Sequence, residues 1–110
     1  TWEIMRDEPG LPAPPCMGAL LSLPQPESAN AQWILCSLPC PEGRKKGTIY
    51  LSSDEGKTWA AKRILYPGGF AYSSLALLPD GRIGCLFEPE NYHNISFLAF
   101  DAAWVTHPSP

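Results

Sequence analysis

Three side chains at the ends of apolar, strand-like runs carry groups that could bind or transform a substrate: Arg44, Tyr72 and Glu88. An arginine guanidinium stays charged and offers a planar fork that suits a carboxylate. A phenol is neutral near neutral pH, so it attacks as a nucleophile only with a partnering base. A carboxylate at the end of an apolar strand is costly unless it is paired. Strand ends on a rigid scaffold are favoured places for binding and catalytic residues.

Each of these side chains also has a purely structural interpretation, and the residues alone leave both open. Arg44 can belong to a solvated basic turn with the two lysines that follow it. Tyr72 can be an ordinary strand tyrosine that packs between sheets, and Glu88 can face water at the end of its strand. The serines after Tyr72 have no His and Asp at a spacing that suggests a serine hydrolase.

A hairpin turn with the pattern S-x-D-x-G-x-T-W lies between these side chains, at Ser52-Ser53-Asp54-Glu55-Gly56-Lys57-Thr58-Trp59. We expect Asp54 to accept hydrogen bonds from nearby backbone N–H groups, and Gly56 to take the positive φ that a tight turn needs. We expect Trp59 to cover the strands that follow the turn. Ser52, Asp54, Gly56, Thr58 and Trp59 are therefore predicted to be architectural residues of this Asp box.

The composition favours an all-β fold. Thirteen prolines and nine glycines in 110 residues fall between short apolar runs, which suits strands joined by turns better than helices. A net charge of −3 argues against a nucleic-acid surface, and no apolar run reaches the roughly 18 residues of a membrane span. The expected strands are 18–23, 32–38, 47–53, 62–66, 71–78, 83–88 and 94–101.

The chain contains two copies of one unit. The aligned pairs are Trp2 with Trp59, 17–24 with 72–79, and 33–39 with 83–89. A period near 50 residues with three or four strands per unit predicts the blades of a β-propeller. We expect blade copies at about 1–58 and 59–105, with a frayed tail at 106–110. Because propellers have at least four blades, and Thr1 begins inside another box, we expect the C-terminal part of a larger propeller.

Four cysteines permit three disulfide pairings in a secreted chain: Cys16, Cys36, Cys40 and Cys85. Cys36 and Cys85 lie inside apolar runs, where a free cysteine behaves as a small hydrophobe. No second Cys or His pair accompanies Cys36 and Cys40 at the spacing of a zinc site. We therefore expect no metal site and no cofactor, while the disulfide state and the compartment stay open.

The stretch from Pro39 to Glu88 resembles the C-terminal catalytic region of the non-viral, Asp-box type of exo-α-sialidase (neuraminidase). The motifs that carry the resemblance are GRKKGTIYLS at 43–52, AYSSL at 71–75 and PDGRIGCLFE at 79–88, and the tail 95–104 is similar to the closing strand of that family. The resemblance implies about two blades of a six-bladed propeller. It also implies sialylated glycans as binding partners, and further N-terminal blades that complete the ring.

The resemblance implies a role for each of the three side chains. Tyr72 is the expected nucleophile, and Arg44 is one of three arginines that bind the substrate carboxylate. Glu88 is the glutamate that holds another of those arginines in place. A neutral phenol suits sialic acid because a carboxylate nucleophile would meet the carboxylate on the anomeric carbon. Sialidases are the tyrosine exception among retaining glycosidases.

Other members of that family's site have no counterpart in this sequence, namely the aspartate acid/base, the glutamate partner of the tyrosine and two arginines. We therefore expect a parent enzyme that releases terminal α-linked sialic acid, and no turnover by the isolated chain. Two alternatives stay open: a non-catalytic Asp-box propeller that binds carbohydrate or protein, and a propeller hydrolase for another sugar acid. Linkage preference and the balance between hydrolysis and transfer are not set by these residues.

Overall fold

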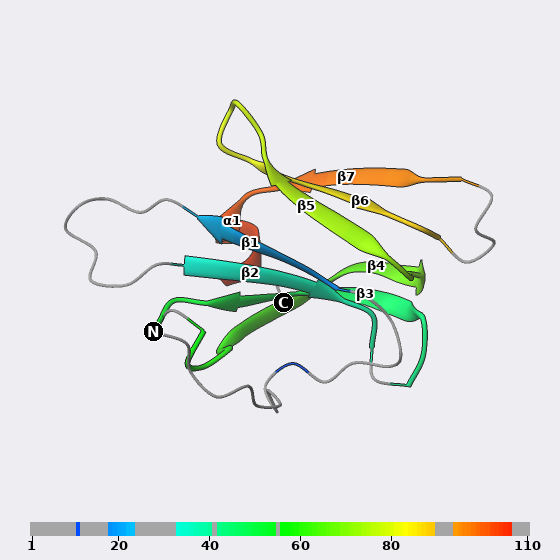
Figure 1. Ribbon diagram of the computed structural model, residues 1–110, viewed down its shortest axis with the longest axis horizontal. Coiled ribbons are helices and arrows are strands. Elements are labelled where there is room, and N and C mark those ends of the chain that lie inside the picture. Colours follow the sequence, from blue (N-terminus) through cyan, green and yellow to red (C-terminus); the bar gives the residue numbers. More distant parts are fainter. Residues whose placement is uncertain are drawn as a thin grey trace, which may run out of the picture.

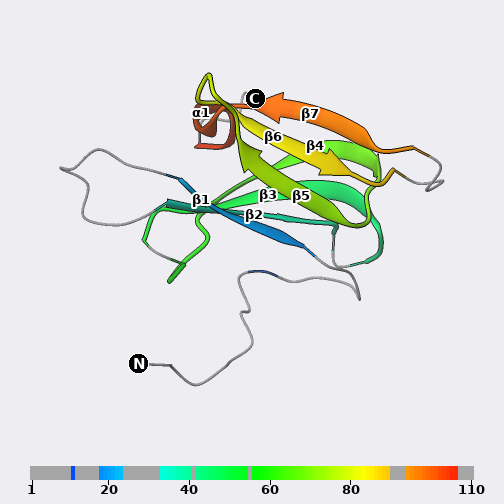
Figure 2. The ribbon, with the colours of Figure 1, turned by 45° about the horizontal axis from the view of Figure 1, so that its top comes forward.

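The chain folds into two antiparallel sheets that stack on each other (Figures 1 and 2). The structure, a computed structural model, describes residues 11, 18–23, 33–40, 42–54, 56–89 and 94–106. Sheet A has the strand order β1-β2-β3-β4, and sheet B has the order β5-β6-β7. The elements are β1 Ala19–Leu23, β2 Trp33–Leu38, β3 Lys45–Ser52, β4 Ala61–Gly69, β5 Ser73–Leu77, β6 Ile83–Phe87, β7 Ser96–Phe100 and α1 Ala102–Thr106.

The all-β prediction is confirmed, since each of the seven expected runs overlaps one strand, although β3 and β4 begin earlier and β4 ends later than expected. Within each sheet, consecutive strands pair as antiparallel neighbours. The expected closing strand is shorter than predicted: β7 ends at Phe100, and the short helix α1 follows. Within the described ranges, no helix has the length and apolarity needed to cross a bilayer.

The strand that follows the Asp box belongs to the same sheet as the strand that precedes it. β4 pairs with β3, so that Lys62 lies opposite Tyr50. Sheet A therefore spans 19–69 and sheet B spans 73–100, whereas the predicted copies of the repeat run from one Asp-box tryptophan to the next. The predicted boundary between the two copies, after residue 58, thus falls inside sheet A, between β3 and β4.

The strand register corrects the alignment of the two copies by one residue. Leu20 lies opposite Cys36, and its counterpart Leu75 lies opposite Cys85. The structural counterpart of Cys36 is therefore Cys85, 49 residues later, where the alignment used an offset of 50. A slip of one residue moves every side chain to the other face of its strand. The alignment missed the slip because both of these strands carry apolar residues on both faces.

One apolar core lies between the sheets. The rings of Phe70 and Phe87 stack with centroids 4.8 Å apart, and Tyr66 packs against Phe87 at 5.1 Å. Burying one large apolar side chain contributes roughly 1.5–3 kcal/mol. The other buried members of the core are Leu23, Leu35, Ile49, Leu51, Ile83, Cys85, Phe100 and Val105.

The helix α1 returns the chain from sheet B to sheet A. Its start is capped by Asp101, whose carboxylate accepts the N–H of Trp104 at 2.9 Å, and Val105 is buried in the core. Arg63 on β4 donates a hydrogen bond to the carbonyl of Trp104 at 2.8 Å. The guanidinium carbon of Arg63 also lies 4.2 Å from the centroid of that residue's ring. Arg63 therefore fixes α1 to the outer strand of sheet A.

The three cysteines that the structure describes are free thiols: Cys36, Cys40 and Cys85. The prediction that Cys36 and Cys85 are buried small hydrophobes is confirmed. Burial raises the pKa of the Cys36 thiol to about 11 and that of the Cys85 thiol to about 12. Cys16 lies outside the described residues. The described part of the chain contains no group of three side chains that could hold a metal ion.

Candidate active site

The Asp box is a turn closed by hydrogen bonds among its own polar residues. The carboxylate of Asp54 accepts the hydroxyl of Ser52 at 2.7 Å, and it accepts the N–H and hydroxyl of Thr58 at 2.9 and 2.6 Å. The Ser52 hydroxyl oxygen accepts the N–H of Gly56 at 2.8 Å, and Gly56 has a φ of 87°. The hydrogen bonds from Thr58, followed by the one from Ser52, lower the pKa of Asp54 to about 2.

Trp59 packs against the strands that precede the turn. It lies on the cluster of Cys36, Leu38 and Tyr50 from β2 and β3, so the prediction that it covers the following strands is wrong. The reason is geometric, because the turn reverses the chain and lays the residue after it beside the strand before it. The indole nitrogen Nε1 of Trp59 is the one buried side-chain nitrogen or oxygen without a partner within the described ranges.

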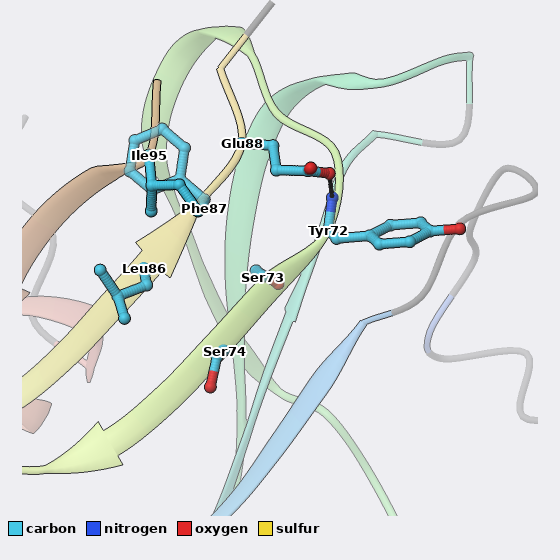
Figure 3. A pocket seen from close by; sticks show the side chains of 7 residues that line it. All are labelled: Tyr72, Ser73, Ser74, Leu86, Phe87, Glu88 and Ile95. Atoms are coloured by element: carbon cyan, nitrogen blue, oxygen red, sulfur yellow. Dashed lines mark hydrogen bonds between the residues drawn. The ribbon is translucent and has the colours of Figure 1, made fainter. Parts of the chain in front are cut away.

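Tyr72 and Glu88 face each other at one end of sheet B. Tyr72 directly precedes β5, and Glu88 directly follows β6, so the antiparallel pairing of these strands brings them together. The N–H of Glu88 donates to the carbonyl of Tyr72 at 3.1 Å. In return, the carboxylate oxygen Oε1 of Glu88 accepts the N–H of Tyr72 at 3.3 Å (Figure 3).

Arg44 approaches the same tyrosine from sheet A. Its guanidinium carbon lies 5.4 Å from the centroid of the Tyr72 ring. Both side chains are exposed, and Tyr72 keeps 45% of its surface accessible. A cation over an aromatic face at an exposed site is worth roughly 0.5–1 kcal/mol. Two side chains that lie 28 positions apart in the sequence thus meet on an open surface.

A turn and a β-bulge set the direction in which Arg44 leaves the sheet. The N–H of Cys40 donates to the carbonyl of Lys45 at 2.8 Å and closes the turn. Lys46 has a φ of 52°, and the register of β3 and β4 shifts on both sides of Gly47. A bulge of this kind re-aims the end of a strand and is common beside functional sites.

Phe70 links the segment that carries the arginine to the segment that carries the tyrosine. Its N–H donates to the carbonyl of Arg44 at 2.9 Å. Its buried ring lies so close to Gly47 that a Cβ atom built on that glycine would overlap it. Sequence reasoning missed Phe70 and Gly47 because a glycine beside two lysines gives no periodic signal.

A cavity of about 290 Å³ lies beside Tyr72 and Glu88. Its lining is mainly apolar. Glu88 is the acidic residue of the lining, and both Ser73 and Ser74 contribute to it. Figure 3 shows the phenol of Tyr72 pointing away from Leu86 and Ile95. The lining residues are Tyr72, Ser73, Ser74, Leu86, Phe87, Glu88 and Ile95.

Sequence comparison relates the chain to two sialidases. It is 39% identical over 79 residues to a sialidase of Micromonospora viridifaciens, a match that covers 71% of this chain and 12% of that protein. It is 34% identical over 96 residues to Sialidase-2 of Cricetulus griseus, and this match covers 77% of the chain and 25% of the relative. No family model matches the chain. The chain thus corresponds to a quarter or less of the length of these relatives.

A comparison of folds gives the same result. The Hadza microbial sialidase Hz136 superposes with a TM-score of 0.71 at 28% identity, over 84% of this chain and 19% of the solved chain. The two stacked antiparallel sheets therefore match part of a sialidase fold. By sequence and by fold, the chain belongs to the sialidase family as a segment of its β-propeller.

Proposed function

We propose that the protein containing this chain is an exo-α-sialidase, in which Tyr72 is the nucleophile and Arg44 binds the substrate carboxylate. One observation carries the proposal: the guanidinium of Arg44 lies 5.4 Å from the centroid of the exposed Tyr72 ring. In a sialoside, the carboxylate and the leaving group are attached to the same anomeric carbon. A substrate whose carboxylate contacts Arg44 therefore has its reacting carbon within reach of a neighbouring group such as the phenol.

The residue types fit the charges of this reaction. A guanidinium gives the substrate carboxylate a permanent positive charge and two parallel N–H donors. A phenol brings no negative charge to the anomeric carbon before reaction, whereas an aspartate or glutamate would be repelled by the substrate carboxylate. The exposure of both side chains leaves them open to a ligand that contacts the two together.

In the proposed reaction, the Tyr72 oxygen forms a bond to the anomeric carbon while the glycosidic bond breaks. The departing sugar oxygen takes a proton from an acid, and the phenolic proton passes to a base, both from other parts of the protein. Water then attacks the same carbon and the bond from that carbon to the Tyr72 oxygen breaks. The water gives a proton to the group that had acted as the acid, the Tyr72 oxygen regains its proton from the base, and sialic acid leaves with retained configuration. Because this chain lacks those partners, we expect no turnover when it is isolated.

We assign Glu88 a positioning role. Its carboxylate accepts the N–H of Tyr72, and its N–H donates to the carbonyl of Tyr72, so it holds the backbone of the nucleophile at two points. The carboxylate also lines the cavity beside Tyr72. From there it can pair with an arginine supplied by another part of the protein, which is the role that the family resemblance implies.

We further propose that neighbouring blades of the same protein cover the outer faces of the two sheets. The outer face of sheet B leaves Leu86 48% exposed and Phe97 54% exposed. By the corrected register, Leu86 of sheet B is the counterpart of Ser37 of sheet A. Ser37 lies on the face of sheet A that packs against sheet B. A further sheet stacked on sheet B in the same manner would cover these apolar side chains.

The test uses the complete protein and a fluorogenic α-sialoside. We expect hydrolysis by the native protein, no turnover above background after Tyr72→Phe, and a raised KM after Arg44→Ala. Arg44→Lys keeps the charge without the fork and is expected to lie between the native protein and Arg44→Ala. Native rates in Tyr72→Phe would remove the assigned nucleophile. Binding of sialosides without hydrolysis would favour a non-catalytic Asp-box propeller that binds carbohydrate. Hydrolysis of a uronide in place of the sialoside would favour a propeller hydrolase for another sugar acid.

A further inference from the structure

A hydrogen bond between two serine side chains joins the sheets beside the candidate site. The hydroxyl oxygens of Ser37 on β2 and Ser73 on β5 lie 2.7 Å apart. Ser37 is wholly buried, and Ser73 is the first residue of β5. The buried apolar core lies between the same two sheets.

A buried hydroxyl needs a partner, because burial has removed its hydrogen bonds to water. Apolar packing is non-directional, so each apolar contact constrains the direction of approach of the two sheets less than a hydrogen bond does. A hydrogen bond between two short side chains fixes both distance and direction. The serine pair therefore defines the position of β5 on sheet A more sharply than the apolar contacts do.

The repeat indicates that this hydrogen bond is not a general requirement of sheet stacking. Ala19 lies opposite Ser37 in sheet A, and its counterpart Ser74 lies opposite Leu86 in sheet B. The position occupied by Ser37 in one copy is therefore occupied by leucine in the other. The polar pair Ser37–Ser73 is thus found at the interface beside Tyr72, and one of its members directly follows Tyr72 in the chain.

We infer that Ser37 is a positioning residue for Tyr72 and that it acts through Ser73. Ser73 directly follows Tyr72, and the backbone of Tyr72 is held from the other side by Glu88. Arg44 directly precedes β3 of sheet A, and Tyr72 directly precedes β5 of sheet B. The hydrogen bond between the two serines therefore helps to set the distance between the guanidinium and the phenol, together with the hydrogen bond from Phe70 to Arg44. The catalytic part of this inference rests on the proposed sialidase function, whereas the geometric part does not.

The kinetic test uses Ser37→Ala, Ser73→Ala and the double variant in the complete protein, with Tyr72→Phe alongside. Because small displacements of a reacting group cost about tenfold to a hundredfold in rate, we expect each single variant to lower kcat by about tenfold. The KM is expected to change less than about twofold, because Arg44 still binds the carboxylate. The double variant is expected to match the single ones, since one hydrogen bond is lost in all three. Ser53→Ala, an exposed serine in the turn after β3, is the matched control.

A structural arm separates this inference from the proposed function. In crystal structures of the native protein and of Ser73→Ala, we expect the distance from the Arg44 guanidinium to the Tyr72 ring to increase past about 6 Å in the variant. An unchanged distance would overturn the inference whether or not the protein is a sialidase. Native kcat in both single variants, or losses that multiply in the double variant, would also overturn it. If Tyr72→Phe stays active while the distance changes, the proposed nucleophile is wrong and the positioning role stands.

Discussion

The stacked rings of Phe70 and Phe87, with centroids 4.8 Å apart and planes 23° apart, connect the core to the candidate site. Phe70 lies two residues before Tyr72, and Phe87 lies directly before Glu88. Phe70 also donates its N–H to the carbonyl of Arg44. The three side chains of the site are thus attached to one buried aromatic pair. Changes in this part of the core are therefore expected to alter activity as well as stability.

The first prediction concerns Gly47, whose missing side chain makes room for the ring of Phe70. Gly47→Ala places a methyl group where that ring lies, and overpacking of this kind costs about 1–3 kcal/mol of unfolding free energy. The ring is fully buried and stacks on Phe87. We expect a lower thermal midpoint for the complete protein and a lower kcat, because Phe70 also holds the segment of Arg44.

Gly43 provides the matched control for this prediction. It lies in the same turn region, but a Cβ atom added there meets no atom within 4 Å. Gly43→Ala is therefore expected to change the unfolding free energy by less than about 0.5 kcal/mol. Equal effects of the two substitutions would contradict the assignment of Gly47 as the site of close packing.

Much of the fold could be predicted because strand formation depends on local signals. Each apolar run between proline or glycine turns became a strand, and the Asp54–Gly56 turn has the expected positive φ. The alignment of the copies failed by one residue where strands are apolar on both faces, so alternation could not fix the register. The orientation of Trp59 failed because it depends on which strands the turn brings beside it.

The candidate site was predictable only as a set of residue types. The resemblance to sialidases implied a common site for Arg44 and Tyr72, and the structure brings them together. The groups that hold them were not predictable, because Ser37, Gly47 and Phe70 act through contacts between distant segments. Ser37 gains its partner only when the two sheets stack, and Gly47 meets Phe70 only when β3 pairs with β4.

The second prediction concerns the left-handed backbone of Lys46, with a φ of 52°. A β-branched residue is strongly disfavoured in this region, so Lys46→Ile is expected to lower the unfolding free energy by about 1–2 kcal/mol. Lys45→Ile changes the neighbouring exposed lysine at an ordinary strand position, where isoleucine is favoured. Lys46→Gly takes this φ without steric cost and is expected to be tolerated. Equal losses from the two isoleucine variants in urea unfolding would contradict this interpretation.

The third prediction concerns the pH dependence of the Asp box. The hydrogen bonds from Thr58 and Ser52 lower the pKa of Asp54 to about 2, below the value of about 3.9 for an unfolded chain. The folded state therefore binds this proton less readily than the unfolded state. The stabilisation is complete above about pH 4 and is lost as the pH falls toward about 2. We expect the thermal midpoint to fall across this range in the native protein.

Two variants isolate the contribution of Asp54 to that acid transition. Asp54→Asn removes the titrating group, so its midpoint is expected to be lower at neutral pH and to fall less between pH 4 and 2. Thr58→Val keeps the N–H donor and removes the hydroxyl donor, so it is expected to lie between the two. An NMR titration of the Asp54 carboxyl carbon measures the pKa itself. A value near 4 would show that these hydrogen bonds do not form.

The fourth prediction concerns the attachment of α1 to β4 by Arg63. Its side chain donates to the carbonyl of Trp104 at 2.8 Å and lies 4.2 Å from the ring centroid of the same residue. Arg63→Met keeps much of the apolar stem but loses the cation and the donor. We expect a loss of about 1–2 kcal/mol of unfolding free energy, from one charged hydrogen bond and one cation–π contact. Lys62→Met removes an exposed cation from the opposite face of the same strand and is expected to cost less than about 0.5 kcal/mol.

Hydrogen exchange gives the sharper measurement of this attachment, because the amides of 102–106 are expected to lose protection in Arg63→Met while those of β6 keep theirs. Equal protection of the helix in both variants would mean that the burial of Val105 alone holds α1 in place.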